Sequence, residues 1–131
     1  MIDGTKPISE FMTPAPRSIE ADLTLADGRE RMASDGIRHL PVFDDDRLVG
    51  IVSARDIILL EALPGIDPEE ATVAAAMTAN PATCAPDTSL LEVLNLMNDR
   101  HLGAVPITNK GDLLGIFTDV DAVRLLRDAL S

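Results

Sequence analysis

The chain has 131 residues, which is enough for one domain or for two very small ones. Apolar residues make up 46% of it, which excludes a disordered chain, and a formal net charge of −11 disfavours binding to nucleic acid or to anionic membranes. It has no apolar run near the roughly 20 residues of a membrane span, no signal-peptide pattern at its start and a single cysteine, so we expect a cytoplasmic protein without an intrachain disulfide.

The first half of the chain is predicted to form a β-α-β-β-α unit. The Pro-rich stretch TPAPRSIEAD has room for one short strand, and a helix capped by Asp22 or Thr24 should follow it. The segments RHLPVFD and RLVGIVS are predicted to be two strands, joined into a hairpin by the turn at 44–46. A last helix is expected to begin near Ala54.

A loop and a second unit of the same kind follow. The segment LPGIDPEEAT, at 63–72, has two prolines and a glycine, so it is predicted to be a linker. After it come the Pro-rich stretch TANPATCAPD and a helix capped by Asp87 or Ser89. One face of that helix carries Leu90, Val93, Leu94 and Met97. The strands GAVPITN and DLLGIFT, with the turn NKG between them, lead to a helix that begins near Asp119.

The two halves are copies of one sequence. Residues 12–56 align with 77–121 without a gap, and eleven positions carry the same residue. The identical pairs are Met12/Met77, Thr13/Thr78, Pro16/Pro81, Asp22/Asp87, Leu25/Leu90, Met32/Met97, Pro41/Pro106, Leu48/Leu113, Gly50/Gly115, Ile51/Ile116 and Asp56/Asp121. We therefore place two βαββα repeats at 6–62 and 73–131, with the linker 63–72 between them. A repeat of about 55 residues has a small core, so we expect an α/β fold in which the repeats pack on each other around aliphatic side chains.

Each half contains the pattern Gly-Ile-x-(Ser/Thr)-x-x-Asp, at 50–56 and at 115–121. One interpretation is a capping box, in which the hydroxyl caps a helix and the acid three residues later bonds back to the start. The other is a ligand site: a helix start attracts phosphate, the hydroxyl adds a donor, and the carboxylate accepts hydrogen bonds from a ribose diol. The two glycines also have two interpretations. The missing side chain leaves room either for a ligand or for the close approach of a neighbouring strand.

These features together resemble a known family. The Met-Thr pairs at 12–13 and 77–78 and the segments HLPVFDDDRLVGIVSARD and GAVPITNKGDLLGIFTDVD resemble tandem CBS domains, over about residues 6–130. The resemblance implies two CBS repeats packed about a pseudo-twofold axis, with two clefts. It also implies that the clefts bind adenosyl ligands such as AMP, ADP, ATP or S-adenosylmethionine, that the role is regulatory, and that pairs of repeats assemble into homodimers.

The resemblance also assigns residues to the two clefts. The first cleft is expected to contain Ser53, Asp56, Ile51 and His39, with Thr78, Pro81 and Thr83 on its opposite wall. The second is expected to contain Thr118, Asp121, Ile116 and Ala104, with Thr13, Pro16 and Ser18 on its opposite wall. Arg38 lies near the axis and could serve either cleft. Both clefts should accept an adenosine-like group, but Arg55 favours phosphate in the first and Asp119 favours a less negative ligand in the second.

Most of these residues also have a purely structural interpretation. The threonines can end short helices, the prolines can punctuate turns, and the isoleucines can belong to the core. Arg38 can be a solvated charge and His39 a packing residue. The aspartates at 44–46 lack the spacing of a calcium loop, and no other metal-ligand spacing is present. Cys84 matches an isoleucine in the other repeat and is expected to be a small buried residue.

We therefore expect a regulatory module that senses an adenosyl ligand, has no catalytic cofactor, and acts on its own assembly or on a separate protein partner. A homodimer is expected through aliphatic helix faces that include Ile57, Ile58, Leu59 and Leu60 and also Val123, Leu125 and Leu126. The alternative is a dimerisation scaffold with empty clefts. An enzyme is not expected, because no nucleophile–base pair, metal cluster or phosphate-binding loop is visible.

Overall fold

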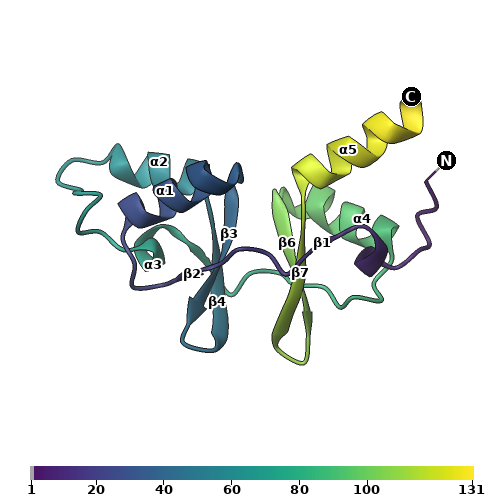
Figure 1. Cartoon of the computed structure of the whole chain (residues 1–131), viewed down its shortest axis with the longest axis horizontal. Helices are drawn as coiled ribbons and strands as arrows, with labels where there is room; N and C mark the ends of the chain where they lie inside the picture. The colour runs from purple at the N-terminus through teal and green to yellow at the C-terminus, as the bar shows by residue number, and fades with distance from the viewer. Residues whose placement is uncertain (1) are drawn as a thin grey trace. The chain divides into compact units, whose positions relative to one another are not determined.

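The structure is a computed structural model that describes residues 2–131, and its fold is mixed α/β, which confirms the predicted class (Figure 1). It divides into two compact units, each with its own sheet and its own core. We call the contiguous segment Arg17–Pro81 the N-repeat unit. The C-repeat unit combines the chain up to Pro16 with Ala82–Ser131.

The N-repeat unit is a four-stranded sheet packed against helices. The strands lie in the order β2-β3-β4-β5; β2 and β3 are parallel, and the other neighbours are antiparallel. The elements are β2 (Ile19–Glu20), α1 (Leu25–Asp35), β3 (His39–Asp44), β4 (Arg47–Ser53), α2 (Ala54–Glu61), α3 (Val73–Ala76) and β5 (Thr78–Ala79). The core consists of Ile19, Leu25, Met32, Leu40, Val42, Val52, Ile57 and Val73.

The C-repeat unit has a three-stranded sheet in the order β1-β7-β6, and both pairings are antiparallel. The elements are the 3₁₀ helix η1 (Ile8–Glu10), β1 (Thr13–Pro14), α4 (Leu90–Arg100), β6 (Ala104–Asn109), β7 (Asp112–Thr118) and α5 (Asp119–Leu130). The core consists of Ile8, Leu90, Val93, Met97, Val105, Ile107 and Phe117. The N-repeat core is aliphatic as predicted, whereas the prediction missed the aromatic ring of Phe117, which is fully buried in the C-repeat core.

The Pro-rich stretches contain more strand pairing than predicted. The first stretch holds two short strands, β1 and β2, where one was expected. In the second stretch, β5 is followed by a single parallel bridge from Cys84 to Ile107. The residue after β1 and the residue after β5 both have a positive φ, 45° at Ala15 and 50° at Asn80. These two turns precede the points where the chain passes from one unit to the other.

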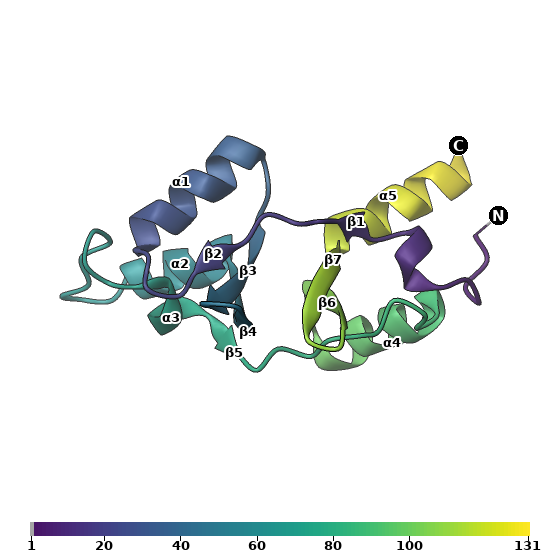
Figure 2. The ribbon, with the colours of Figure 1, turned by 60° about the horizontal axis from the view of Figure 1, so that its bottom comes forward.

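The leading strand of each repeat joins the sheet of the other repeat. β1 pairs with β7, which places Thr13 opposite Ile116, and β5 pairs with β4, which places Thr78 opposite Ile51 (Figure 2). The boundaries of the compact units therefore differ from those of the sequence repeats. The repeat boundaries at 6–62 and 73–131 describe the sequence, and as domain boundaries they remain a prediction.

The same exchange caps the helices that follow the Pro-rich stretches. The amide of Leu90 donates to the carbonyl of Lys6, and the amide of Leu25 donates to the carbonyl of Ala71, both at 2.9 Å. Side chains complete the caps: the hydroxyls of Thr24 and Ser89 each accept from the amide three residues later, at 3.1 Å. The capping residues are thus Thr24 and Ser89 rather than Asp22 and Asp87.

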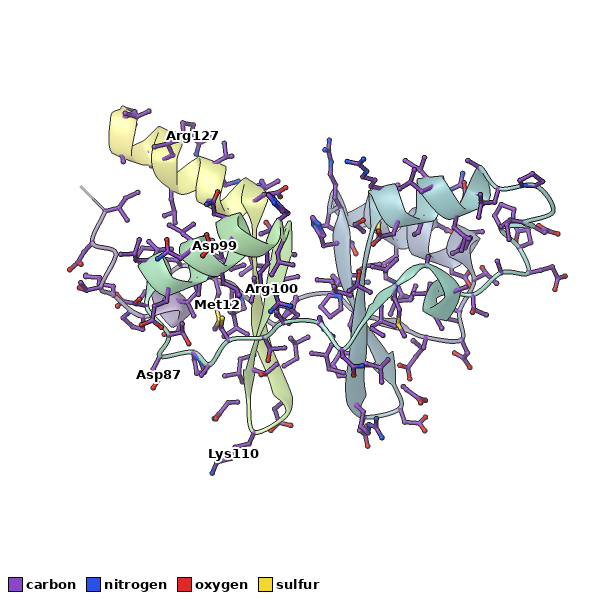
Figure 3. All side chains as sticks on the ribbon, turned by 180° about the vertical axis from the view of Figure 1, so that it is seen from behind. Met12, Asp87, Asp99, Arg100, Lys110 and Arg127 are labelled. Atoms are coloured by element: carbon purple, nitrogen blue, oxygen red, sulfur yellow. The ribbon has the colours of Figure 1, made fainter. Side chains whose placement is uncertain are left out.

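The connecting segments agree with the sequence pattern. The predicted linker at 63–72 contains neither helix nor strand. The hairpin turns fall at the expected places and use positive φ angles, 53° at Asp45 and 52° at Lys110; Lys110 marks the tip of the β6–β7 hairpin (Figure 3). Within residues 2–131, no helix is long and apolar enough to cross a membrane.

Candidate ligand-binding sites

The first Gly-Ile-x-Ser-x-x-Asp motif spans the end of β4 and the start of α2. The amide of Asp56 donates to Ser53 Oγ at 3.0 Å, and the amide of Ser53 donates to Asp56 Oδ2 at 2.9 Å. This is the capping box that the spacing predicts. It holds one carboxylate oxygen of Asp56 against the backbone and fixes the orientation of the group.

The second motif repeats this geometry at the end of β7 and the start of α5. The amide of Asp121 donates to Thr118 Oγ1 at 3.3 Å, and the amide of Thr118 donates to Asp121 Oδ2 at 2.9 Å. The other carboxylate oxygen is also engaged: Thr13 Oγ1 donates to Asp121 Oδ1 at 3.4 Å, and Arg124 Nη1 lies 3.8 Å from it. Thr13 reaches this carboxylate because β1 is exchanged into the C-repeat sheet.

The N-repeat sheet brings most of the first set of predicted site residues together. Ser53 lies opposite His39, and Ile51 lies between Pro41 and Thr78. Since side chains alternate along a strand, Ile51 and Ser53 share the face opposite to the core residue Val52. Asp56 follows in the first turn of α2.

The C-repeat sheet does the same for the second set. Thr118 lies opposite Ala104, and Ile116 lies between Pro106 and Thr13. Both Ile116 and Ala104 are buried. The two sets therefore form matched clusters, each within one compact unit.

The strand pairings do not include the remaining predicted site residues, whose place in a site stays a prediction. Pro81 and Pro16 are the last residues of their segments, while Thr83 and Ser18 each belong to the unit that does not contain their predicted cluster. Arg38 precedes β3, its side chain is exposed, and its carbonyl accepts from the amide of Ala54 at 2.8 Å.

The two motif glycines leave room for the exchanged strands. A Cβ on Gly50 would lie 2.9 Å from the carbonyl oxygen of Thr78 and would collide with the side chain of Met77. A Cβ on Gly115 would lie 2.9 Å from the carbonyl oxygen of Thr13 and would collide with Met12, whose sulfur lies against the β6–β7 hairpin (Figure 3). The structure therefore confirms the close approach of a neighbouring strand at both glycines.

Sequence reasoning missed one residue beside the motifs and gave another an incomplete role. Arg124 reaches the carboxylate of Asp121 from the next turn of α5. Its signal in the sequence was the i, i+3 spacing of opposite charges on a helix. Asp119 was recognised as an extra negative charge, but the structure also shows that its Oδ1 accepts from the amide of Val120 at 2.8 Å.

One hollow in the N-repeat unit is lined by none of the motif residues. It measures about 450 Å³ and is lined by residues of α1 and of the segment before it, namely Arg17, Leu23, Asp27, Glu30, Arg31, Ser34 and Asp35. Arg17 pairs with Asp35 at 3.3 Å, and the guanidinium of Arg31 donates to the carbonyl of Ser18 at 2.7 Å, so both cations already have partners. Across residues 2–131, no group of three or more His, Cys, Asp or Glu side chains is placed to hold a metal ion.

A model of the CBS domain family matches residues 8–62 and 73–128. The chain therefore belongs to the CBS domain family, and both repeats are matched. Hypoxic response protein 1 of Mycobacterium tuberculosis is a relative with 33% identity over 104 residues, which cover 79% of this chain and 73% of that protein.

Solved structures agree with this assignment. An uncharacterized conserved protein from Pyrococcus horikoshii superposes with a TM-score of 0.87 at 29% identity, over 96% of each chain. CBSX2 in complex with AMP has a TM-score of 0.79 at 24% identity, over 96% of this chain and 99% of that one. The CBS domain pair of MJ0100, in complex with 5′-methylthioadenosine and S-adenosyl-L-methionine, has a TM-score of 0.85 at 23% identity, over 95% and 98%. The last two likenesses establish the shared fold.

Proposed function

We propose that this chain is a regulatory module that binds an adenosyl ligand of the AMP, ADP, ATP or S-adenosylmethionine class. Binding then changes its own assembly or its association with a protein partner. The observation that carries the proposal is the pair of matched clusters, in which a hydroxyl, a helix-capping carboxylate and a threonine from an exchanged strand occur together.

The chemistry of each cluster fits the nucleoside part of such a ligand. A carboxylate held by one oxygen in a capping box can accept the two hydroxyls of a ribose on its other oxygen. Adenine would lie between aliphatic side chains and bond to backbone groups, because the chain has neither Trp nor Tyr to stack on it. Two structures of the same fold were solved with adenosyl compounds, which supports this ligand class over other nucleosides.

The assembly proposed for the chain is a homodimer. Large apolar side chains are more than half exposed on α2 and α5, namely Ile58 and Leu59 on the first and Val123 and Leu126 on the second. A second copy that covers such faces is the common solution in soluble proteins. The predicted face needs three corrections. Ile57 is only 1% exposed and belongs to the N-repeat core, and Leu60 and Leu125 are partly buried against the cores of their units.

The module acts by binding and not by catalysis in this proposal. The matching family model describes a CBS domain in both repeats rather than a catalytic domain. The strongly negative net charge supports a small-molecule ligand and a protein partner over nucleic acid or an anionic membrane. We keep the cytoplasm as the proposed location.

A thermal-shift titration tests the proposal. Adenosine, AMP, ATP and S-adenosylmethionine are titrated against the parent and against an Asp56→Ala/Asp121→Ala variant. A ligand that binds only the folded state stabilises it by about 2.7 kcal/mol at 100 times its Kd, which shifts the Tm of a small protein by several degrees. The proposal requires such a shift in the parent and its loss in the variant. A parent without any shift would favour the dimerisation scaffold with empty clefts.

A further inference from the structure

The two candidate sites differ in what faces the motif carboxylate. The outer oxygen of Asp121 accepts from the hydroxyl of Thr13 and lies 3.8 Å from the guanidinium of Arg124. In the N-repeat unit, Leu59 stands at the position that corresponds to Arg124, and its side chain has no atom that can donate to Asp56. A ribose diol at Asp121 would therefore compete with Thr13 and Arg124 for the outer oxygen, whereas no cation stands at the matching position beside Asp56.

A second difference lies at the first residue of each helix. Asp119 begins α5, and its carboxylate accepts from the amide of Val120 at 2.8 Å. Ala54 begins α2 at the matching position and has no acceptor in its side chain. Asp119 thus adds an exposed negative charge two residues before Asp121 and uses an amide at the start of α5.

We propose that the site built on Ser53 and Asp56 is the one that takes the adenosyl ligand, and that Arg124 and Asp119 keep the Thr118 site closed to it. This inference rests on the proposed function and narrows it from two sites to one. It follows from two interactions in the C-repeat unit. Arg124 lies beside the carboxylate of Asp121, and the carboxylate of Asp119 accepts a hydrogen bond from the amide of Val120. Both residues act through their effect on Asp121 and on the start of α5, so they are positioning residues for this site.

Each pairing contributes modestly by itself, so the experiment combines them. The side chain of Arg124 is 63% exposed, and an exposed ion pair changes an equilibrium by a factor of about five at most. The hydrogen bond that the Val120 amide donates to Asp119 adds a contribution of similar size. Removing both pairings should therefore raise the affinity of the Thr118 site by about tenfold.

Neutral adenosine is the appropriate probe. A phosphate could pair with Arg124 directly, which would hide the cost of breaking the Arg124–Asp121 pair. Adenosine has the ribose diol without a charge, so its affinity reports on the carboxylate alone. The matched probe 2′,3′-dideoxyadenosine lacks the diol, so its affinity should not respond to Arg124→Leu.

Calorimetry on the full chain compares reciprocal variants. Asp119→Ala/Arg124→Leu gives the C-repeat site the residues of the N-repeat site, and Ala54→Asp/Leu59→Arg does the reverse. The parent should bind one adenosine per chain. Asp56→Ala should lower the affinity for adenosine by a factor at least ten times larger than Asp121→Ala does. The first double variant should gain a second adenosine, and the second should bind adenosine about tenfold more weakly than the parent.

Leu59 lies on the face proposed for dimerisation, so Leu59→Arg could also change the assembly. The single variant Ala54→Asp therefore repeats the reciprocal test without changing Leu59. Light scattering checks the assembly of every variant. Two equal adenosine sites in the parent, or a larger loss in Asp121→Ala than in Asp56→Ala, would overturn this inference and leave the proposed function intact. The absence of adenosine, AMP and S-adenosylmethionine binding from the parent and from Asp119→Ala/Arg124→Leu would overturn both.

Discussion

The two sequence repeats reach similar folds with few identical residues. Several of the identical residues lie at positions where the fold requires them. Gly50 and Gly115 each leave room for the carbonyl of an exchanged strand. Leu25 and Leu90 are buried leucines at the first position of α1 and of α4. The requirements of packing and close approach therefore account for these repeated residues without reference to any ligand.

Some of the differences between the two copies lie beside the motifs. At the first residue of the helix after the motif, the N-repeat has Ala54 and the C-repeat has Asp119. One turn further along, Leu59 corresponds to Arg124. The capping box itself is the same in both copies. The fold thus fixes the carboxylate, while the residues around it are free to make one site different from the other.

The largest expected effect tests the exchange of the leading segments. Ile8 and its counterpart Val73 are both fully buried, but Ile8 belongs to the C-repeat core and Val73 to the N-repeat core. Ile8→Ala should lower the free energy of unfolding by about 3–4 kcal/mol, measured by urea denaturation. Val73→Ala should cost less, since it removes fewer buried atoms.

Hydrogen exchange locates the damage from each substitution. Amides of α4 should lose protection in Ile8→Ala, and amides of α1 should lose protection in Val73→Ala. If Ile8→Ala instead exposed α1 and spared α4, the leading segment would belong to its own repeat and the exchange would be wrong.

The next effect concerns the motif glycines. Gly115→Ala would place a Cβ 2.9 Å from the carbonyl of Thr13, so we expect a loss of about 2–3 kcal/mol in the free energy of unfolding. Gly50→Ala should cost about the same, because its Cβ would meet the carbonyl of Thr78 at the same distance. The control is Gly4→Ala, whose nearest neighbour would be Leu91 Cβ at 3.3 Å, with an expected loss below about 0.5 kcal/mol. A cost at Gly115 no larger than at Gly4 would mean that β1 does not press on β7.

The sequence predicted the elements well because their signals are local. Alternating apolar residues, the turns at 44–46 and 109–111 and the motif capping boxes each depend on neighbours within a few positions. The pairing of β1 with β7 joins residues that are far apart in the chain, and nothing in the segment around Thr13 identifies its partner strand. A glycine inside each strand did indicate a close approach, without showing which segment approaches.

The candidate sites were predictable to a similar extent. The hydroxyl and carboxylate of each motif have a fixed spacing, so their hydrogen bonds follow from the sequence. The reach of Arg124 to Asp121 depends on side-chain conformation, and the delivery of Thr13 depends on the strand exchange, so neither could be read from spacing alone. Ile57 was placed on an exposed face because a run of four apolar residues does not reveal which one faces the core.

A smaller effect is expected at the ends of α1 and α4. Both helices end in a residue with a positive φ, 65° at Gly36 and 55° at His101. A side chain in this conformation is strained and a glycine is not. His101→Gly should therefore raise the free energy of unfolding by about 0.5–1 kcal/mol, and Gly36→His should lower it by about 1 kcal/mol.

Thermal denaturation tests both variants, because His101→Gly should raise the Tm and Gly36→His should lower it. The two variants should move the Tm up and down by about 4 °C. The double variant should return close to the parent because each substitution changes a helix cap of a different compact unit. A stabilising Gly36→His would contradict the assigned cap geometry, since no atom lies within 4 Å of a Cβ at Gly36 to compensate for the strain.

The smallest effect concerns Cys84, which occupies the position of Ile19 in the other copy. Burial raises the pKa of the Cys84 thiol, and the nearby Glu92 carboxylate raises the same pKa further. A raised pKa lowers the fraction of reactive thiolate at a given pH, so iodoacetamide should modify folded protein more slowly than urea-unfolded protein.

The dependence on pH separates the two causes. Because the folded state favours the protonated thiol, the stability that Cys84 contributes is complete below the pKa of the unfolded thiol and is lost as the pH rises through the higher folded pKa. Glu92→Gln should move the pH midpoint of the folded alkylation rate downward only in part, since burial is the larger cause and remains. Equal alkylation rates in folded and unfolded protein would show that the thiol is open to solvent, and that the single bridge to Ile107 does not hold this segment against the C-repeat core as β2 holds Ile19 in the N-repeat.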